Sequence, residues 1–188
     1  CVRTHIRLEP NAAMWIMVSE DQYDGMVEAP MEFSNASEQQ IKLERWSLTV
    51  ESWTAGEHPT ETIVEEIELE LDQLQSWSDI PQLQDKSGIG RYRTTIRIDK
   101  LQMSAMLAYL ELGEVCDTFR LTINGVKLPP VDQVSRRIEI HPYLQHGLNT
   151  IEIEVATTLN NALTVFEPNR ERQQCGLIGP VTIRLLRV

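Results

Sequence analysis

Apolar and polar residues alternate in short runs along this chain, most clearly on both sides of Asn124-Gly125. Apolar residues occupy every second position before and after this pair: Phe119, Leu121, Ile123, Val126, Leu128 and Pro130. Asn-Gly favours a two-residue turn in which both central residues have positive φ. Such a turn sets Ile123 opposite Val126, which brings all six apolar residues to one face. The pattern therefore predicts a β-hairpin with one buried face.

The same alternation recurs in other short runs between turn-forming residues. The runs are Trp46 to Val50, Tyr92 to Ile98, Ile138 to Ile140, Ile151 to Val155 and Val181 to Leu185. Residues 61–72 fit both helical and strand spacing, and we favour a strand whose glutamates form a solvated face. Many short strands with polar alternate faces predict an all-β fold, an antiparallel β-sandwich. Residues 1–188 suffice for one such domain, in which 1–45 hold less certain N-terminal strands.

Charge and hydropathy exclude several partners. The formal net charge of -11 repels polyanions, so we expect neither nucleic acid nor anionic lipid as a partner. No apolar run approaches the roughly 20 residues of a membrane helix. The longest such run, residues 12–18, suits a buried strand. Because the chain begins at Cys1 with no initiator Met or signal peptide, we expect a processed product or a fragment of a larger enzyme.

No motif with a built-in catalytic mechanism is found. The sequence has no nucleophile elbow, phosphate-binding glycine loop, His-Glu-x-x-His motif or Cys-x-x-Cys pair. The cysteines and histidines show no zinc-ligand spacing. No catalytic residue is therefore assigned, although glycosidase chemistry requires only two carboxylates that meet in space. Asn35-Ala36-Ser37 is a sequon for N-glycosylation, which suits a secreted protein.

Two tryptophans and two arginines are candidates for binding sugar. Trp53 and Trp77 offer rings that can stack on a pyranose, or they pack in the core or at its rim. Arg91 and Arg93 share a strand face and can clamp a carboxylate-bearing sugar or an acidic domain. Alternatively, they form a solvated row paired with the glutamates at 152 and 154.

Roughly the last two-thirds of the chain, from Trp46 onward, resemble a known domain. The resemblance is carried by Ser87 to Tyr92, Leu110 to Gly113, Asn124-Gly125, Leu128 to Pro130, His146 to Thr150, Thr157 to Asn161 and Gly176 to Val181. In this order they resemble the galactose-binding-like β-sandwich of large glycoside hydrolases. The similar domains are the sugar-binding domain of family-two enzymes and the terminal sandwich of α-L-rhamnosidase-like enzymes. The resemblance implies a jelly-roll topology.

The resemblance also implies a role for this domain. In those enzymes the catalytic acids lie on a separate barrel, so the implied role is a non-catalytic module that braces the catalytic domain of the same polypeptide. Two loops of the sandwich reach the sugar site in family-two enzymes. The matching loops here contain Asp85, Lys86 and Ser87, and Arg172, Gln173 and Gln174. We expect both loops at one end of the sandwich, where they either contact sugar or pack on a neighbouring domain.

Further expectations complete this interpretation. Cys116 and Cys175 either form a disulfide or remain two buried thiols. We expect no cofactor; structural calcium is common in such sandwiches, but no oxygen-rich loop identifies its ligands here. We expect the protein to be secreted or at the cell surface. Two alternatives to the brace stay open, an independent carbohydrate-binding module and, more distantly, a glycosidase in its own right.

Overall fold

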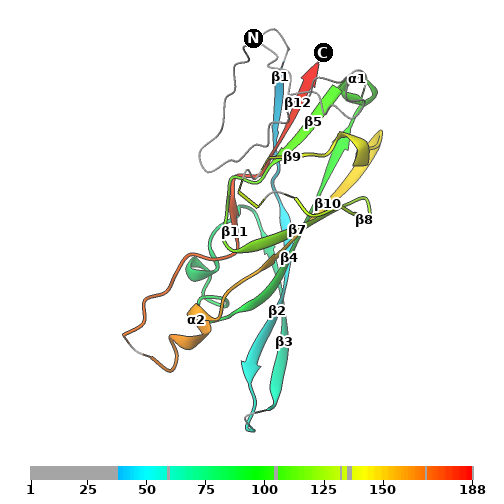
Figure 1. Ribbon diagram of the computed structural model, residues 1–188. Coiled ribbons are helices and arrows are strands. Elements are labelled where there is room, and N and C mark those ends of the chain that lie inside the picture. The colour runs from blue at the N-terminus through cyan, green and yellow to red at the C-terminus, as the bar shows by residue number, and fades with distance from the viewer. Residues whose placement is uncertain are drawn as a thin grey trace, which may run out of the picture.

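A computed structural model describes residues 38–58, 60–103, 106–131, 133–134, 137–167 and 169–187. Within these ranges the chain forms two antiparallel β-sheets and a two-stranded ribbon (Figure 1). The predicted all-β, antiparallel sandwich is therefore confirmed. Residues 12–18 and the glycosylation site at Asn35 lie outside the described residues.

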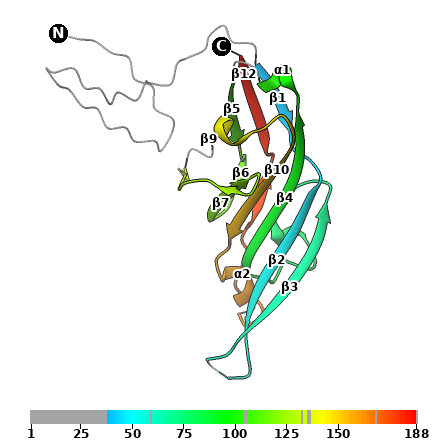
Figure 2. The same ribbon diagram turned by 90° about the vertical axis from the view of Figure 1, so that its right-hand side faces the viewer.

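The larger sheet has six strands in the order β3-β2-β4-β10-β7-β8. These are β2 Trp46–Ala55, β3 Thr62–Leu71, β4 Gly88–Ile98, β7 Thr118–Ile123, β8 Val126–Lys127 and β10 Gly147–Ala156. The long strands β2, β3 and β4 run side by side, and β2 and β3 extend to the lower end in Figures 1 and 2. The candidate binding loops lie at this end of the sandwich.

The smaller sheet has four strands in the order β1-β12-β5-β9. These are β1 Glu38–Lys42, β5 Met106–Glu111, β9 Arg137–Glu139 and β12 Thr182–Arg187, and the ribbon pairs β6 Glu114–Val115 with β11 Leu177–Gly179. The helices are η1 Trp77–Asp79, α1 Lys100–Met103, η2 His141–Tyr143 and α2 Asn160–Leu163. Over the part of the chain that the structure describes, no helix is long and apolar enough to cross a membrane.

A continuous apolar core lies between the two sheets. Leu48, Tyr92 and Ile153 reach it from the larger sheet, and Leu110 and Ile183 reach it from the smaller one. The strands supply these residues at every second position, because successive side chains of a strand point to opposite faces. The polar residues between them therefore cover the outer faces of the sandwich.

The acidic run from 61 to 72 confirms its predicted conformation. It forms β3, which pairs with β2 along its full length and has no other neighbour among the described strands. Ile67, Leu69 and Leu71 are half-buried against the core. The glutamates between them are exposed. Strand spacing therefore prevails over helical spacing in this run.

The hairpin at Asn124-Gly125 is confirmed in its turn and its register. Both turn residues have positive φ, 51° and 78°, and Ile123 lies opposite Val126. The prediction that every apolar residue of the hairpin is buried is wrong for Val126, which is 52% exposed, and for Pro130, which is also exposed. The reason is that β8 is a two-residue strand at the edge of the sheet, where the core does not extend.

The side chain of Asn124 fixes this turn to neighbouring segments. Its Nδ2 donates to the carbonyl of Tyr143 at 2.9 Å and to Oδ1 of Asn149 at 2.8 Å. Its Oδ1 accepts from the amide of Thr150 at 2.9 Å. Asn149 is fully buried. Asn124 therefore stabilises the turn in two ways: its backbone adopts the positive φ that the turn requires, and its side-chain amide bonds to neighbouring segments.

Candidate functional site

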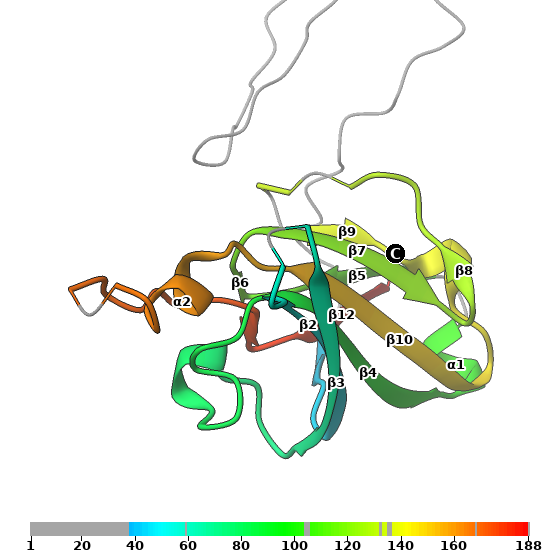
Figure 3. The same cartoon turned by 90° about the horizontal axis from the view of Figure 1, so that it is seen from below.

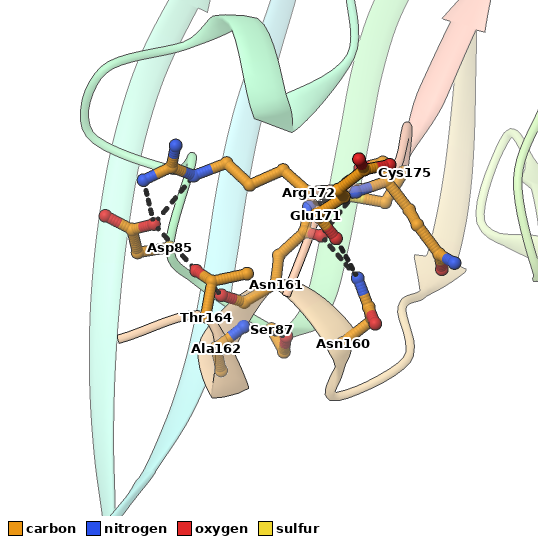
Figure 4. A network of polar contacts seen from close by, with 10 residues as sticks. Asp85, Ser87, Asn160, Asn161, Ala162, Thr164, Glu171, Arg172 and Cys175 are labelled. Atoms are coloured by element: carbon orange, nitrogen blue, oxygen red, sulfur yellow. Dashed lines mark hydrogen bonds and ion pairs between the residues drawn. The ribbon is translucent and has the colours of Figure 1, made fainter. Parts of the chain in front are cut away.

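One end of the sandwich carries most of the candidate residues. Figure 4 shows residues of the loop before β4 beside residues of α2 and of the segment after it. In Figures 1 and 3, α2 and the segment that follows it project from the body of the sandwich. The loops that the resemblance places at one end of the sandwich do lie together.

Asp85 and Arg172 join these two loops directly. Nε and Nη2 of Arg172 donate to Oδ1 of Asp85 at 2.9 and 2.7 Å, and Oγ1 of Thr164 donates to the same oxygen at 3.2 Å (Figure 4). Both charged side chains are partly exposed. Their charges neutralise one another within the chain, so the pair first of all fastens the projecting segment to the sandwich.

Lys86 and Ser87 are also engaged by other residues of the chain. Nζ of Lys86 lies 2.6 Å from Oε2 of Glu65 on β3. Ser87 is buried, and its hydroxyl oxygen accepts from the amide of Ala162 at 3.3 Å. Its carbonyl accepts from the amide of Trp53 at 3.1 Å. This loop therefore links β3, β2 and α2.

Asn161 is the buried centre of the network. Its Nδ2 donates to the carbonyl of Gln173 at 2.8 Å and to Sγ of Cys175 at 3.3 Å, and its Oδ1 accepts from the amide of Gln173 at 2.9 Å. Asn160 donates to the carbonyl of Glu171 at 3.1 Å. From the sequence alone, capping of a turn is the default role for two adjacent asparagines such as Asn160 and Asn161. The structure instead shows them tying α2 to the segment before β11.

The network supports a set of exposed apolar side chains, which we call the apolar tip. The four residues of the apolar tip are exposed by 36 to 76%: Leu159, Leu163, Val165 and Phe166. Sequence analysis did not single them out, because they lie outside any strand pattern. The sequence signal for them was four large apolar residues within the eight positions 159–166, beside the polar residues Asn160, Asn161 and Thr164.

Trp77 is not available as a stacking platform. Its side chain is fully buried, and its indole N–H donates to the hydroxyl of Tyr92 at 2.6 Å. The same hydroxyl accepts from the amide of Leu177 at 3.0 Å, and burial raises the pKa of Tyr92. A Cβ added at Gly90 would lie 2.5 Å from the Trp77 ring. The core packing of Trp77 thus replaces its predicted role in sugar binding.

Trp53 lies on the outer face of β2 and is 42% exposed. Its indole N–H donates to Oε1 of Glu51 at 2.9 Å. Nη2 of Arg91 lies 3.3 Å from the other carboxylate oxygen, Oε2. The hydrogen bond from Trp53, and after it that from Arg91, lowers the pKa of Glu51. The exposed ring is thus held by an ionised carboxylate.

Arg91 and Arg93 form ion pairs across the same sheet. Nε of Arg91 lies 3.3 Å from Glu154, and Nη2 of Arg93 lies 3.0 Å from Glu152. The clamp hypothesis required guanidinium groups open to a carboxylate ligand. These pairs instead support the alternative, a solvated row paired with its own glutamates.

Cys116 and Cys175 form no disulfide, so of the two alternatives the structure supports two thiols, of which Cys175 is buried and Cys116 is partly buried. The amide of Cys116 donates to the carbonyl of Gly176, which aligns Cys116 with Gly176 and not with Cys175. Burial raises the pKa of the Cys175 thiol to about 11. Within the described ranges, no group of three or more His, Cys, Asp or Glu side chains is placed to hold a metal ion.

Comparison with known proteins identifies relatives by structure. No protein-family model and no curated protein matches this chain. A rhamnosidase from Novosphingobium sp. PP1Y matches 82% of the chain with 22% identity and a TM-score of 0.63. A β-D-glucuronidase from Dictyoglomus thermophilum matches 85% with 19% identity and a TM-score of 0.53, and one from an uncultured Clostridium sp. matches 86% with 15% identity and a TM-score of 0.54.

The chain spans only a small part of each of these proteins. It corresponds to 16% of the rhamnosidase and to 29% and 31% of the two β-glucuronidases. At these identities the likeness concerns the fold. The chain thus has the β-sandwich fold of one part of much longer glycoside hydrolases.

Proposed function

We propose that this chain is a non-catalytic accessory domain of a larger, secreted or surface glycoside hydrolase, and that it braces the catalytic domain. In this proposal residues 1–188 form one galactose-binding-like jelly roll. The supporting observation is the apolar tip, which projects on a hydrogen-bonded support at one end of a sandwich spanning 16 to 31% of similar glycoside hydrolases.

The hydrogen bonds beneath the apolar tip favour docking. A loop that is ordered before it binds loses little conformational entropy when it docks. Asn161, Thr164 and Arg172 fix the segment from within, while Val165 and Phe166 stay 64 and 76% exposed. Exposed apolar residues that gather in one place mark interaction surfaces. The proposed occupant is the catalytic domain of the same polypeptide.

The state of the acids at this end supports a non-catalytic role. Asp85 is bound to Arg172, and Glu65 is bound to Lys86. Glycoside hydrolysis requires one acid that donates a proton and a second carboxylate that acts as base or nucleophile. Both carboxylates are thus already bound by cations of the same chain. The predicted sugar contacts of Asp85, Lys86 and Arg172 would require these pairs to open, whereas Gln173 is bonded to Asn161 through its backbone.

The docking role is tested in the full-length polypeptide. Phe166→Ser should lower the melting temperature of the parent enzyme and leave that of the isolated chain unchanged, because the exposed ring stabilises only the docked state. Leu148→Ser is the matched control, since Leu148 is 59% exposed on β10. Equal melting temperatures of the Phe166→Ser variant and the wild-type parent would contradict docking through the apolar tip.

Activity of the isolated chain provides a second test. We expect no release of nitrophenol from aryl rhamnosides, glucuronides or galactosides by the isolated chain, whereas the parent enzyme hydrolyses one of them. Turnover by the chain alone would support the glycosidase alternative.

The carbohydrate-binding alternative is favoured by a different observation, the exposed ring of Trp53.

A further inference from the structure

Trp53 occupies a position that the docking proposal does not explain. Strand β2 alternates strictly, with Trp46, Leu48 and Val50 directed into the core, so Trp53 faces outward. Trp46 and Trp77 are fully buried, whereas Trp53 is 42% exposed. Large aromatic side chains contribute most when buried, so an outward ring on a regular strand forgoes that stabilisation.

The exposed ring of Trp53 is held in one orientation. Glu51 precedes it by two residues and lies on the same face of β2, so the indole N–H reaches Oε1 only if the ring leans along the strand. Arg91 holds the other oxygen of Glu51 and also contacts Glu154 on β10. The indole N–H is therefore anchored to the sheet, while 42% of the residue stays exposed.

The neighbours of Trp53 combine apolar surface with paired charges. Val64 lies directly opposite on β3 and is 57% exposed. Ile89 lies opposite Glu51 on β4 and shares its face, which puts it diagonal to Trp53. Beyond them stand the ion pairs of Arg91 with Glu51 and Glu154. An apolar strip is thus bordered by fixed donors and acceptors of hydrogen bonds.

This combination matches the chemistry of a pyranose. A sugar ring offers a face of C–H groups that packs on an aromatic ring, and its equatorial hydroxyls bond to side chains around the edge. The site lies on a sheet face, which suits several sugar units of an extended chain. The net charge of -11 and the glutamates nearby favour a neutral chain over an acidic one.

We propose that Trp53, together with Val64, Ile89, Glu51 and Arg91, forms a surface site for an extended neutral polysaccharide. The site lies on the outer face of the larger sheet, whereas the docking role concerns the apolar tip. Either proposal therefore stands if the other fails.

The test titrates the isolated chain with neutral β-1,4-linked hexasaccharides of glucose, xylose and mannose by calorimetry. We expect saturable binding of at least one of them and a weakening of about tenfold or more in Trp53→Ala, since the variant loses the stacking ring. Trp53→Phe keeps a ring without the N–H and should retain most of the affinity. Leu148→Ala is the matched control on β10 and should bind like the wild type.

Tryptophan fluorescence gives an independent measurement. Bound sugar should shift the emission of the wild type, and the shift should vanish in Trp53→Phe, because that variant lacks the tryptophan at the proposed site. Trp46 and Trp77 are buried, and Trp15 lies outside the described residues. Thermal unfolding of each variant shows that the fold is retained. Absence of binding to all three hexasaccharides at millimolar concentration would overturn the proposal, as would equal affinity of Trp53→Ala and the wild type. A Trp53→Ala variant that weakens docking to the catalytic domain without affecting sugar binding would assign this face to protein contact instead.

Discussion

Asn161 shows how much one buried amide contributes to the candidate docking end. It is 2% exposed, and its side chain makes four hydrogen bonds, two with the backbone of Gln173, one with Cys175 and one with Asn160. A buried polar side chain is stable in such a place only when its donors and acceptors are paired. The projecting segment before β11 therefore depends on this residue for its position.

Asn161→Ala should lower the free energy of unfolding by about 1 to 3 kcal/mol, because the backbone groups of Gln173 lose their partners. Urea denaturation followed by circular dichroism measures the change. Asn169→Ala is the matched control, since Asn169 lies on the same segment and is exposed. A cost for Asn161→Ala no larger than that of the control would mean that the network does not hold the segment.

Cys175 makes stability depend on alkaline pH. Burial raises the pKa of its thiol from 9.0 to about 11, so the unfolded chain releases this proton at a lower pH than the folded chain. The contribution to stability is therefore complete below about pH 9 and is lost as the pH rises towards 11.

The difference in unfolding free energy between the wild type and Cys175→Ser should change across this pH range, because the serine hydroxyl does not ionise. Other groups titrate in both proteins, so their contributions cancel when the two unfolding free energies are subtracted. Chemical denaturation at several pH values from 7 to about 11 gives the measurement. A difference that is independent of pH would show that the thiol is not desolvated in the folded state.

At the scale of elements, the β7–β8 hairpin separates two contributions to turn stability. No atom lies within 4 Å of a Cβ added at Gly125, whose φ is 78°. Gly125→Ala should therefore cost about 1 kcal/mol from backbone strain alone. Asn124→Gly keeps the positive φ and removes only the bonds to Tyr143, Asn149 and Thr150, so its cost measures the side chain.

We expect Asn124→Gly to cost more than Gly125→Ala, about 1 to 3 kcal/mol, because it leaves the buried Asn149 without one of its partners. Thermal unfolding of the two variants gives the comparison. Equal costs would indicate that the amide of Asn124 exchanges its partners for water without loss. A larger cost for Gly125→Ala would mean that the stability of the turn comes mainly from backbone conformation and not from the Asn124 side chain.

The elements that the sequence predicted correctly are those governed by local rules. Period-two alternation located β2, β4 and β10, and Asn124-Gly125 located the hairpin with its register. The order of strands within each sheet is not local, because β12 inserts between β1 and β5 across more than 70 residues of sequence. Alternation identifies a strand but says nothing of which strand lies beside it.

The candidate site was less predictable for a similar reason. Trp53 is out of phase with the alternating residues Trp46, Leu48 and Val50, and its side chain is exposed in the structure. Trp77 lies in no strand, so nothing in its surroundings distinguished a core ring from an exposed one. Its burial depends on Gly90, which leaves room for the ring, and on Tyr92, whose hydroxyl accepts from the indole N–H. Both contacts come from the tertiary structure and leave no local signal in the sequence around Trp77. The partners of Arg172 and Asn161 were likewise set by tertiary contacts and not by spacing.

At the scale of the whole molecule, the charged side chains of the edge strand β3 disfavour self-association through the larger sheet. Strand β3 has one neighbour among the described strands, and its outward face holds Glu66, Glu68 and Glu70. Charged residues on an edge strand hinder the addition of another strand. The acidity of this chain is therefore concentrated where an unpaired backbone would otherwise attract a second copy.

The triple change of Glu66, Glu68 and Glu70 to Gln should make the chain associate at neutral pH, because like charges no longer separate two edges. Sedimentation velocity measures the association. A variant with Glu44, Glu114 and Glu171 changed to Gln removes the same charge at exposed positions away from this edge and should stay monomeric. Association of both variants to the same extent would attribute the effect to net charge.

The position of β12 has a consequence for how this fold tolerates shortening. Many domains tolerate trimming near a terminus, because the residues removed there are peripheral. Here Thr182–Arg187 is hydrogen-bonded on both sides, to β1 and to β5. A truncated gene or a protease that removed these six residues would split the smaller sheet between β1 and β5. It would also take the buried side chains of Ile183 and Leu185 out of the core. Any fusion, tag or truncation engineered into this molecule must therefore leave the stretch after Val181 intact.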